Sequence, residues 1–166
     1  EYRPGARKVV HHAIFAAVKG GSLAALDMLD LGHNQLASLP ELLFELKKLE
    51  FLYLSNNKLK NISPNIAGLN SLVYLNCTDN QIKRLPEEIG DLTNLIEFRL
   101  YNNQISSLPN SIGRLKNLQE LHAMNNKLTS IPESAGKLKN LRKLILTSNS
   151  ISALPTALGE AVSLTD

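Results

Sequence analysis

The segment LVYLNCTDNQIKRLPEEIGDL, at residues 72–92, sets the pattern for most of the chain. A second copy, LIEFRLYNNQISSLPNSIGRL, follows at residues 95–115, a step of 23 residues. The same step separates six leucines and six asparagines: Leu26, Leu49, Leu72, Leu95, Leu118 and Leu141, and Asn34, Asn57, Asn80, Asn103, Asn126 and Asn149. A fixed period of this length is typical of a solenoid built from stacked units. We therefore predict six units, at residues 26–48, 49–71, 72–94, 95–117, 118–140 and 141–163.

Each unit carries apolar residues at fixed positions, counted with its first leucine as position 1. These are positions 1, 4, 6, 11, 14, 18 and 21, with small residues such as Cys77, Ala123 and Ala135 counted as apolar. The alternation around positions 4 and 6 predicts a short strand, and positions 14, 18 and 21, which surround a proline, predict a helical or 3₁₀ turn. One unit cannot bury this set alone, so the units must stack around one continuous core.

The pattern LxxLxLxxNxLxxLPxxIGxL resembles the leucine-rich repeat in its 23-residue typical and bacterial-like form. It is similar to the repeats of Ras-suppressor-like and plant intracellular Ras-group proteins, bacterial effectors and leptospiral proteins. The resemblance implies an α/β repeat solenoid: a curved, right-handed horseshoe with a parallel concave β-sheet and short helical or 3₁₀ convex segments. Two departures are local. Pro64 stands one position late, so the turn there is expected to differ, and Ala123 and Ala135 predict looser packing in the fifth unit.

The flanking residues differ from the repeats. Residues 1–25 are interpreted as an N-terminal helical cap that ends at Gly20-Gly21 and covers the core. Residues 164–166 match the start of a truncated seventh repeat. A bare end of this kind suggests a fragment of a longer protein, because repeat arrays need polar-faced ends.

Composition narrows the classes of partner. The 166 residues are 43% hydrophobic and 20% charged, a globular balance, and the net charge of +3 is too weak to indicate nucleic acid or an anionic membrane. The single cysteine excludes an internal disulfide, and no apolar run approaches the roughly 18 residues of a membrane helix. We expect no cofactor, nucleic-acid, membrane or small-molecule partner.

The residues that could carry chemistry have simpler interpretations. The six recurrent asparagines are predicted to bond exposed backbone groups where each strand ends, a structural ladder rather than a ligand site. Cys77 is expected in the core. His33 and His122 lie four units apart and cannot share a metal. Glu120 and His122 share a face near Thr147, but a regular strand offers no oxyanion hole. We predict no catalytic and no metal site.

Two sequons begin at Asn61 and Asn76, and Asn76 is expected on the sheet surface. Such triplets arise often by chance, so glycosylation is a minor expectation.

The candidate binding surface is the concave face, which we define by the strand positions 3 and 5 with the flanking position 7. Side chains alternate along a strand, so positions 3 and 5 face outward when 4 and 6 face the core. Four of the eight aromatic residues fall on this face in neighbouring units: Phe51, Tyr53, Tyr74 and Tyr101. Aromatic and arginine side chains often anchor protein interfaces. The predicted binding residues are Met28, Phe51, Tyr53, Tyr74, Asn76, Glu97, Arg99, Tyr101, His122, Met124 and Lys143.

Charge is also ordered along the concave face. Acidic residues lie at its N-terminal end (Asp27, Asp30 and Glu50) and basic ones at the other (Arg142 and Lys143). A partner of opposite polarity would be steered into one orientation.

The sequence thus predicts a non-catalytic module that binds a protein or peptide partner. One alternative is the recognition segment of a larger enzyme, such as a bacterial effector ubiquitin ligase or a repeat-containing kinase. Another is a structural spacer. Because neither Cys-rich caps nor a signal peptide is visible, the expected location is the cytoplasm, with export as a bacterial effector as the alternative.

Overall fold

The computed structural model describes residues 23–160. The N-terminal cap predicted at residues 1–25 lies outside the described residues except for its last three, and so does the start of a seventh repeat at 164–166. Within residues 23–160, no helix is long and apolar enough to cross a membrane.

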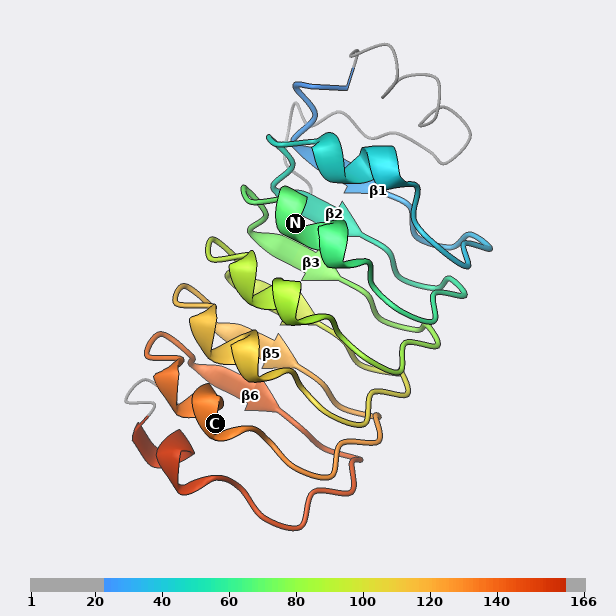
Figure 1. Ribbon diagram of the computed structural model, residues 1–166. Coiled ribbons are helices and arrows are strands. Elements are labelled where there is room, and N and C mark those ends of the chain that lie inside the picture. Colours follow the sequence, from blue (N-terminus) through green and yellow to red (C-terminus); the bar gives the residue numbers. More distant parts are fainter. Residues whose placement is uncertain (1–22, 161–166) are drawn as a thin grey trace.

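In residues 23–160, six short parallel strands form one sheet in chain order, stacked side by side (Figure 1). They are β1 (Met28–Asp30), β2 (Phe51–Tyr53), β3 (Tyr74–Asn76), β4 (Glu97–Arg99), β5 (Glu120–His122) and β6 (Lys143–Ile145). Each strand pairs with the next in a register that steps by one unit, as in Tyr74 opposite Glu97. The period of the sequence therefore places equal positions of successive units beside one another.

Each unit then returns along the convex side through a five-residue 3₁₀ turn. The turns are η2 (Glu41–Glu45), η3 (Pro64–Gly68), η4 (Glu87–Asp91), η5 (Asn110–Arg114), η6 (Glu133–Lys137) and η7 (Thr156–Glu160). In η2, η4, η5 and η6 a proline directly precedes the turn, where no backbone N–H is needed. The late Pro64 was expected to alter the turn in the second unit, and this expectation is wrong. Ser63 replaces the proline and its Oγ accepts a hydrogen bond from the Asn65 N–H at 3.2 Å.

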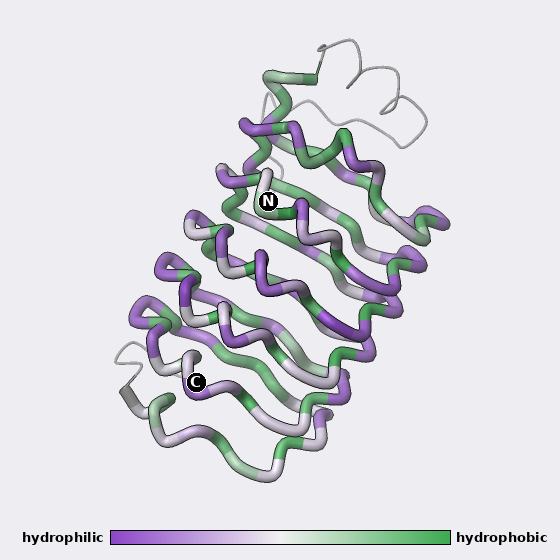
Figure 2. Tube along the Cα trace, in the orientation of Figure 1, coloured by the Kyte–Doolittle hydropathy of each residue, from purple (hydrophilic) through white to green (hydrophobic). Residues whose placement is uncertain are grey.

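The core lies between the sheet and the convex turns. The central strand residues Leu52, Leu75 and Phe98 are fully buried, and the small residues Ala123 and Ala135 are buried as well. Hydrophobic residues recur at equal places in successive coils, whereas hydrophilic ones gather in the connecting turns (Figure 2). The looser packing expected around the two alanines stays a prediction.

Two rows of polar side chains, which we call polar ladders, bond backbone groups at the two edges of the stacked units. In the interior units, the position-9 asparagine bonds backbone of its own unit and of the preceding one. Asn57 shows the pattern: its Oδ1 accepts from Leu36 N at 3.0 Å, and its Nδ2 donates to Leu31 O and Leu54 O at 2.8 and 3.1 Å. The residue before each asparagine has a positive φ of 52–57°. This turn exposes the carbonyls that the asparagine binds.

The second ladder occupies position 23, at the other edge, and the sequence analysis missed it. Asn94, Asn117 and Asn140 each donate through Nδ2 to a backbone carbonyl of the preceding unit, at 2.7–3.0 Å. Ser71 Oγ donates to Lys47 O at 2.6 Å in the same place. The signal was available, because a polar amide recurs at this position in three successive units.

Candidate functional site

The concave face carries half-buried side chains at positions 3 and 5 of β2 to β5, with the buried residue of position 4 between them. The predicted binding residues at these positions therefore point away from the core. Met28, on β1, is the exception, because it is 5% exposed. The structure thus gives a partner little of Met28 to contact.

Three aromatic rings meet on β2 and β3. The Tyr74 ring centroid lies 5.0 Å from that of Tyr53 and 6.4 Å from that of Phe51, with tilts of 38° and 32°. These distances are in the range of favourable ring pairs. We call these three residues the aromatic cluster. Tyr101, predicted to join them, lies beyond β4 and makes no ring contact with the cluster in the described part of the chain.

Arg99 joins the cluster to the charged half of the face. Its guanidinium carbon lies 5.7 Å from the Tyr74 ring centroid, which is a cation–π distance. Its Nε donates to Glu97 Oε1 at 2.5 Å. Burial disfavours the charged guanidinium, but the hydrogen bond to Glu97 and the neighbouring tyrosines outweigh it and raise the pKa of Arg99. The arginine is therefore charged and lies over an aromatic ring.

The environment of Tyr74 marks it as the centre of this arrangement. Burial raises the pKa of its hydroxyl to about 12, with smaller contributions from Glu97 and Tyr53, while Arg99 and the hydrogen bond from Asn76 oppose the shift. The phenol is thus neutral throughout the physiological range. It can accept and donate hydrogen bonds without adding charge to the face.

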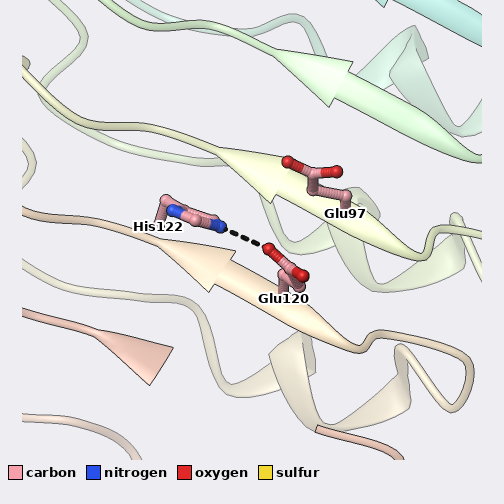
Figure 3. Close-up of side chains that lie close together, drawn as sticks. All are labelled: Glu97, Glu120 and His122. Carbon is pink, nitrogen blue, oxygen red and sulfur yellow. Dashed lines mark hydrogen bonds and ion pairs between the residues drawn. The ribbon is translucent and has the colours of Figure 1, made fainter. Parts of the chain in front are cut away.

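Glu97, Glu120 and His122 lie close together on β4 and β5, as Figure 3 shows. His122 Nε2 is 2.8 Å from Glu120 Oε2, and Lys143 Nζ lies 3.5 Å from Glu120 Oε1. The hydrogen bond with His122, aided by Lys143, lowers the pKa of the Glu120 carboxyl despite its partial burial. The charged residues therefore form a charge network of two adjacent groups: the Glu97–Arg99 pair on β4, and Glu120 with His122 and Lys143 on β5 and β6.

This network could in principle hold a cation, since one ligand atom from each of Glu97, Glu120 and His122 lies within 4.8 Å of the others. Two features disfavour that use. Arg99 and Lys143 already neutralise the two carboxylates, and the imidazole is hydrogen-bonded to one of them. A divalent ion would have to displace these partners, so the geometry supports a fixed charge network more than a metal centre.

The same network does not assemble a nucleophile and base. Within residues 23–160, no hydrogen bond links His122 to the hydroxyl of Thr147. Cys77 is fully buried, and burial raises the pKa of its thiol well above the ordinary value. The described residues thus place no activated nucleophile on the concave face.

The Asn76 side chain bonds two residues of its own unit, Thr78 and Tyr74. Its Oδ1 accepts from Thr78 N at 3.1 Å, and its Nδ2 donates to the Tyr74 hydroxyl at 3.4 Å. Thr78 is 2% exposed, which leaves the sequon at Asn76 poorly accessible. Asn76 therefore serves to position Tyr74. Met124, at position 7 of the fifth unit, is half-buried.

A groove of about 530 Å³ follows the sheet edge beside the second polar ladder. It is lined by Glu50, Ser71, Val73, Asn94, Ile96, Asn117, Gln119 and Asn140. Ile96 is a large hydrophobic residue with 38% exposure. The sequence analysis did not identify this groove, because it forms between position 2 of one unit and position 23 of its neighbour.

Comparisons with known proteins agree with the repeat geometry. A family model described as "Leucine rich repeat" matches residues 24–82, and one described as "Leucine Rich repeats (2 copies)" matches residues 70–113 and 116–156. No curated protein sequence matches the chain.

Several solved structures share the fold. A leucine-rich-repeat protein of Leptospira interrogans is 32% identical with a TM-score of 0.84, and the match covers 94% of this chain and 45% of that one. The ectodomain of the Arabidopsis thaliana receptor kinase GASSHO1/SCHENGEN3, in complex with CASPARIAN STRIP INTEGRITY FACTOR 2, is 39% identical with a TM-score of 0.74, over 84% of this chain and 18% of that one.

The plant peptide hormone receptor RGFR1, in complex with RGF2, is 32% identical with a TM-score of 0.80, over 100% of this chain and 26% of that one. In each of these three matches, the chain spans less than half of the solved protein.

Proposed function

This chain belongs to the leucine-rich-repeat family, and on that premise we propose that it is a non-catalytic module whose concave face binds a protein or peptide. Protein interaction in general is supported by the family and by the two similar plant receptors, each described in complex with a partner. The family and its fold are typically non-catalytic. The observation that carries the concave-face assignment is the aromatic cluster with Arg99 above Tyr74.

The aromatic cluster supports binding because a partner can bury the ring surface that the fold leaves exposed. Phe51, Tyr53 and Tyr74 remain half-exposed on the face that lies opposite the core. Aromatic residues with an adjacent arginine are the side chains that most often dominate binding energy. Each ring is already positioned by its neighbour, so a partner would order few new rotamers on this side.

The charged network supports specificity on the same face. Arg99 pairs with Glu97 on β4, while Glu120 pairs with His122 on β5 and with Lys143 on β6. Fixed charges discriminate among partners more than they add affinity. The concave face thus offers an apolar half for affinity and a charged half for selection.

The alternatives from the sequence remain distinct proposals. A recognition segment of a larger enzyme would use the same face, as one similar structure is the ectodomain of a receptor kinase. A spacer would tolerate serine at every ring of the cluster. The proposed location is the cytoplasm, with export as a bacterial effector as the alternative, and fractionation of the source cells distinguishes the two.

The test is affinity capture with the immobilised chain, from lysate of the source organism and, if that is a pathogen, of its host. Wild type is compared with a variant that carries serine at Phe51, Tyr53, Tyr74 and Tyr101. A matched control carries serine at four residues away from the concave face: Gln35, Gln81, Gln104 and Thr129. Circular dichroism verifies that all three chains fold.

We expect proteins retained by the wild type and the control to be lost by the aromatic variant. Equal retention by all three chains would contradict the concave-face assignment and move the site to the convex side or the edge groove. Full function with serine at all four aromatic positions would favour the spacer.

A further inference from the structure

Resting on the proposed function, we infer that the partner presents an extended segment with an apolar side chain followed, two residues later, by an acidic one. The apolar side chain packs on the exposed surface of the Tyr53 and Tyr74 rings, and the side-chain carboxylate binds the outer edge of the Arg99 guanidinium. The occupant is thus a peptide segment of the form apolar-x-Asp/Glu.

The first support is the state of the Arg99 guanidinium. Its Nε is used by Glu97, but within residues 23–160 no hydrogen bond or ion pair engages either Nη atom. The side chain is 37% exposed, so its outer edge is accessible on the concave face. A guanidinium held this way presents two parallel N–H donors, which match the two oxygens of a carboxylate.

The second support is the orientation that Tyr74 imposes. The guanidinium carbon lies over the Tyr74 ring at 5.7 Å from its centroid and Nε is bonded to Glu97, so two contacts hold the group in place before any partner arrives. Pre-positioning lowers the entropic cost of a bidentate contact. A lysine at the same place would offer a point charge without the two parallel N–H donors.

The neighbouring carboxylates do not occupy the two parallel N–H donors of Arg99. Glu120 is held by His122 and Lys143, and Glu97 meets Arg99 on the Nε side. The two carboxylates and two cations of this half nearly cancel, so the attraction for an acidic group is local to the Arg99 edge. A highly acidic partner gains no general advantage, whereas one well-placed carboxylate does.

Spacing sets the position of the apolar residue. Neighbouring strands lie roughly 4.8 Å apart, and alternate residues of an extended peptide are about 6.6 Å apart on one face. The Tyr53 and Tyr74 ring centroids are 5.0 Å apart, and Arg99 lies one strand further along the sheet. A peptide that crosses the strands therefore sets one side chain on the rings and the side chain two residues on over Arg99.

The place of Arg99 in the sheet favours a side-chain carboxylate over a chain terminus. It lies on β4, and the described residues place three strands on one side of β4 and two on the other. A peptide that ended at Arg99 would leave part of the face uncovered, including His122 and Lys143. A segment that continues past Arg99 can contact the whole face.

The test is selection of displayed 12-residue random peptides on the folded chain. In the main library each peptide is fused to the coat protein through its C-terminus, so only side-chain carboxylates are available. Four chains are compared: wild type, Arg99→Gln, Arg99→Lys and Arg114→Gln. Arg114 is a matched control, since it lies on the convex turn η5 with a side chain 56% exposed.

We expect apolar-x-Asp/Glu sequences to be enriched on wild type and Arg114→Gln, to be lost on Arg99→Gln and to be weakened on Arg99→Lys. For a selected peptide, fluorescence anisotropy should show at least tenfold weaker binding when its acidic residue becomes the amide, because a hydrogen bond between two charged groups is lost.

The inference would be overturned by enrichment without an acidic residue, by enrichment that persists on Arg99→Gln, or by enrichment solely from a second library with free C-termini. Peptides that bind Arg99→Gln as well as wild type but are lost on a fifth chain, Tyr74→Ala, would leave the proposed function standing while they reject this inference. The absence of any enriched sequence would also overturn it.

Discussion

Replacement of Asn103 by alanine should destabilise the fold more than any other single loss of a polar contact in its unit. Asn103 is 8% exposed, and its Oδ1 accepts from Ile82 N at 2.9 Å. Its Nδ2 donates to Cys77 O and Leu100 O, each at 2.9 Å. One side chain thus bonds the backbone of two successive units.

The expected magnitude follows from these contacts. The two donated bonds are worth about 1 kcal/mol each, and the Ile82 N–H left unbonded in a buried place costs about 1–3 kcal/mol. Asn103→Ala should therefore lower the free energy of unfolding by about 3–5 kcal/mol, given the two sets of contacts.

The matched control is the same substitution in the first unit. Asn34 donates to Leu31 O and Gly32 O at 3.0 and 3.1 Å, but its Oδ1 accepts no hydrogen bond from the described residues. It is also partly exposed, so water can replace its bonds. Asn34→Ala should lower the free energy of unfolding by about 1 kcal/mol.

Urea unfolding followed by far-ultraviolet circular dichroism measures both losses. Equal losses for Asn103→Ala and Asn34→Ala, or a loss below 1 kcal/mol for Asn103→Ala, would refute the reasoning that the ladder links neighbouring units.

Three further predictions concern packing and titration. Gly113→Ala should destabilise the fold measurably in the same urea assay, because an added Cβ would lie 2.2 Å from the Ser134 carbonyl oxygen; Gly159→Ala, with nothing within 4 Å, should be near neutral, and equal effects would contradict this. Tyr74 should titrate near pH 12, visible as one late step at 295 nm that Tyr74→Phe removes. Between the ordinary value of 10.0 and about 12 the unfolded chain loses this proton first, so stability should fall as pH rises through that window; a single step near pH 10 for every tyrosine would reject the shift. The buried Cys77 thiol should resist a thiol reagent in the native state and react at once in urea, and fast native labelling would show that the core opens there.

Most of the fold could be predicted from the sequence because one 23-residue pattern repeats. The apolar residues at positions 4 and 6 predicted strands, and the structure has each strand at positions 3 to 5. The family and the solenoid fold are confirmed by the family models and the similar structures. The period also predicts which residues lie side by side, such as Glu97 and Glu120 across β4 and β5.

What the period does not reveal is the direction of each side chain. The stacking of Arg99 on Tyr74 depends on the rotamers that Glu97 and Asn76 select, and no spacing rule gives these. The burial of Met28 was missed for a similar reason, since position 3 is half-buried in the next four strands. The altered turn expected at Pro64 was wrong because Ser63 supplies the cap from its side chain.

The most direct measurement of the central claim is the affinity of a captured partner for wild type, Tyr74→Ala and Arg99→Ala, by isothermal titration calorimetry. Loss of a central aromatic or arginine anchor often costs 2 kcal/mol or more, roughly a 30-fold loss of affinity. Each variant should therefore bind at least tenfold more weakly, whereas the convex control Arg114→Gln should bind as tightly as wild type. Unchanged affinity for both Tyr74→Ala and Arg99→Ala would contradict a binding site on the concave face.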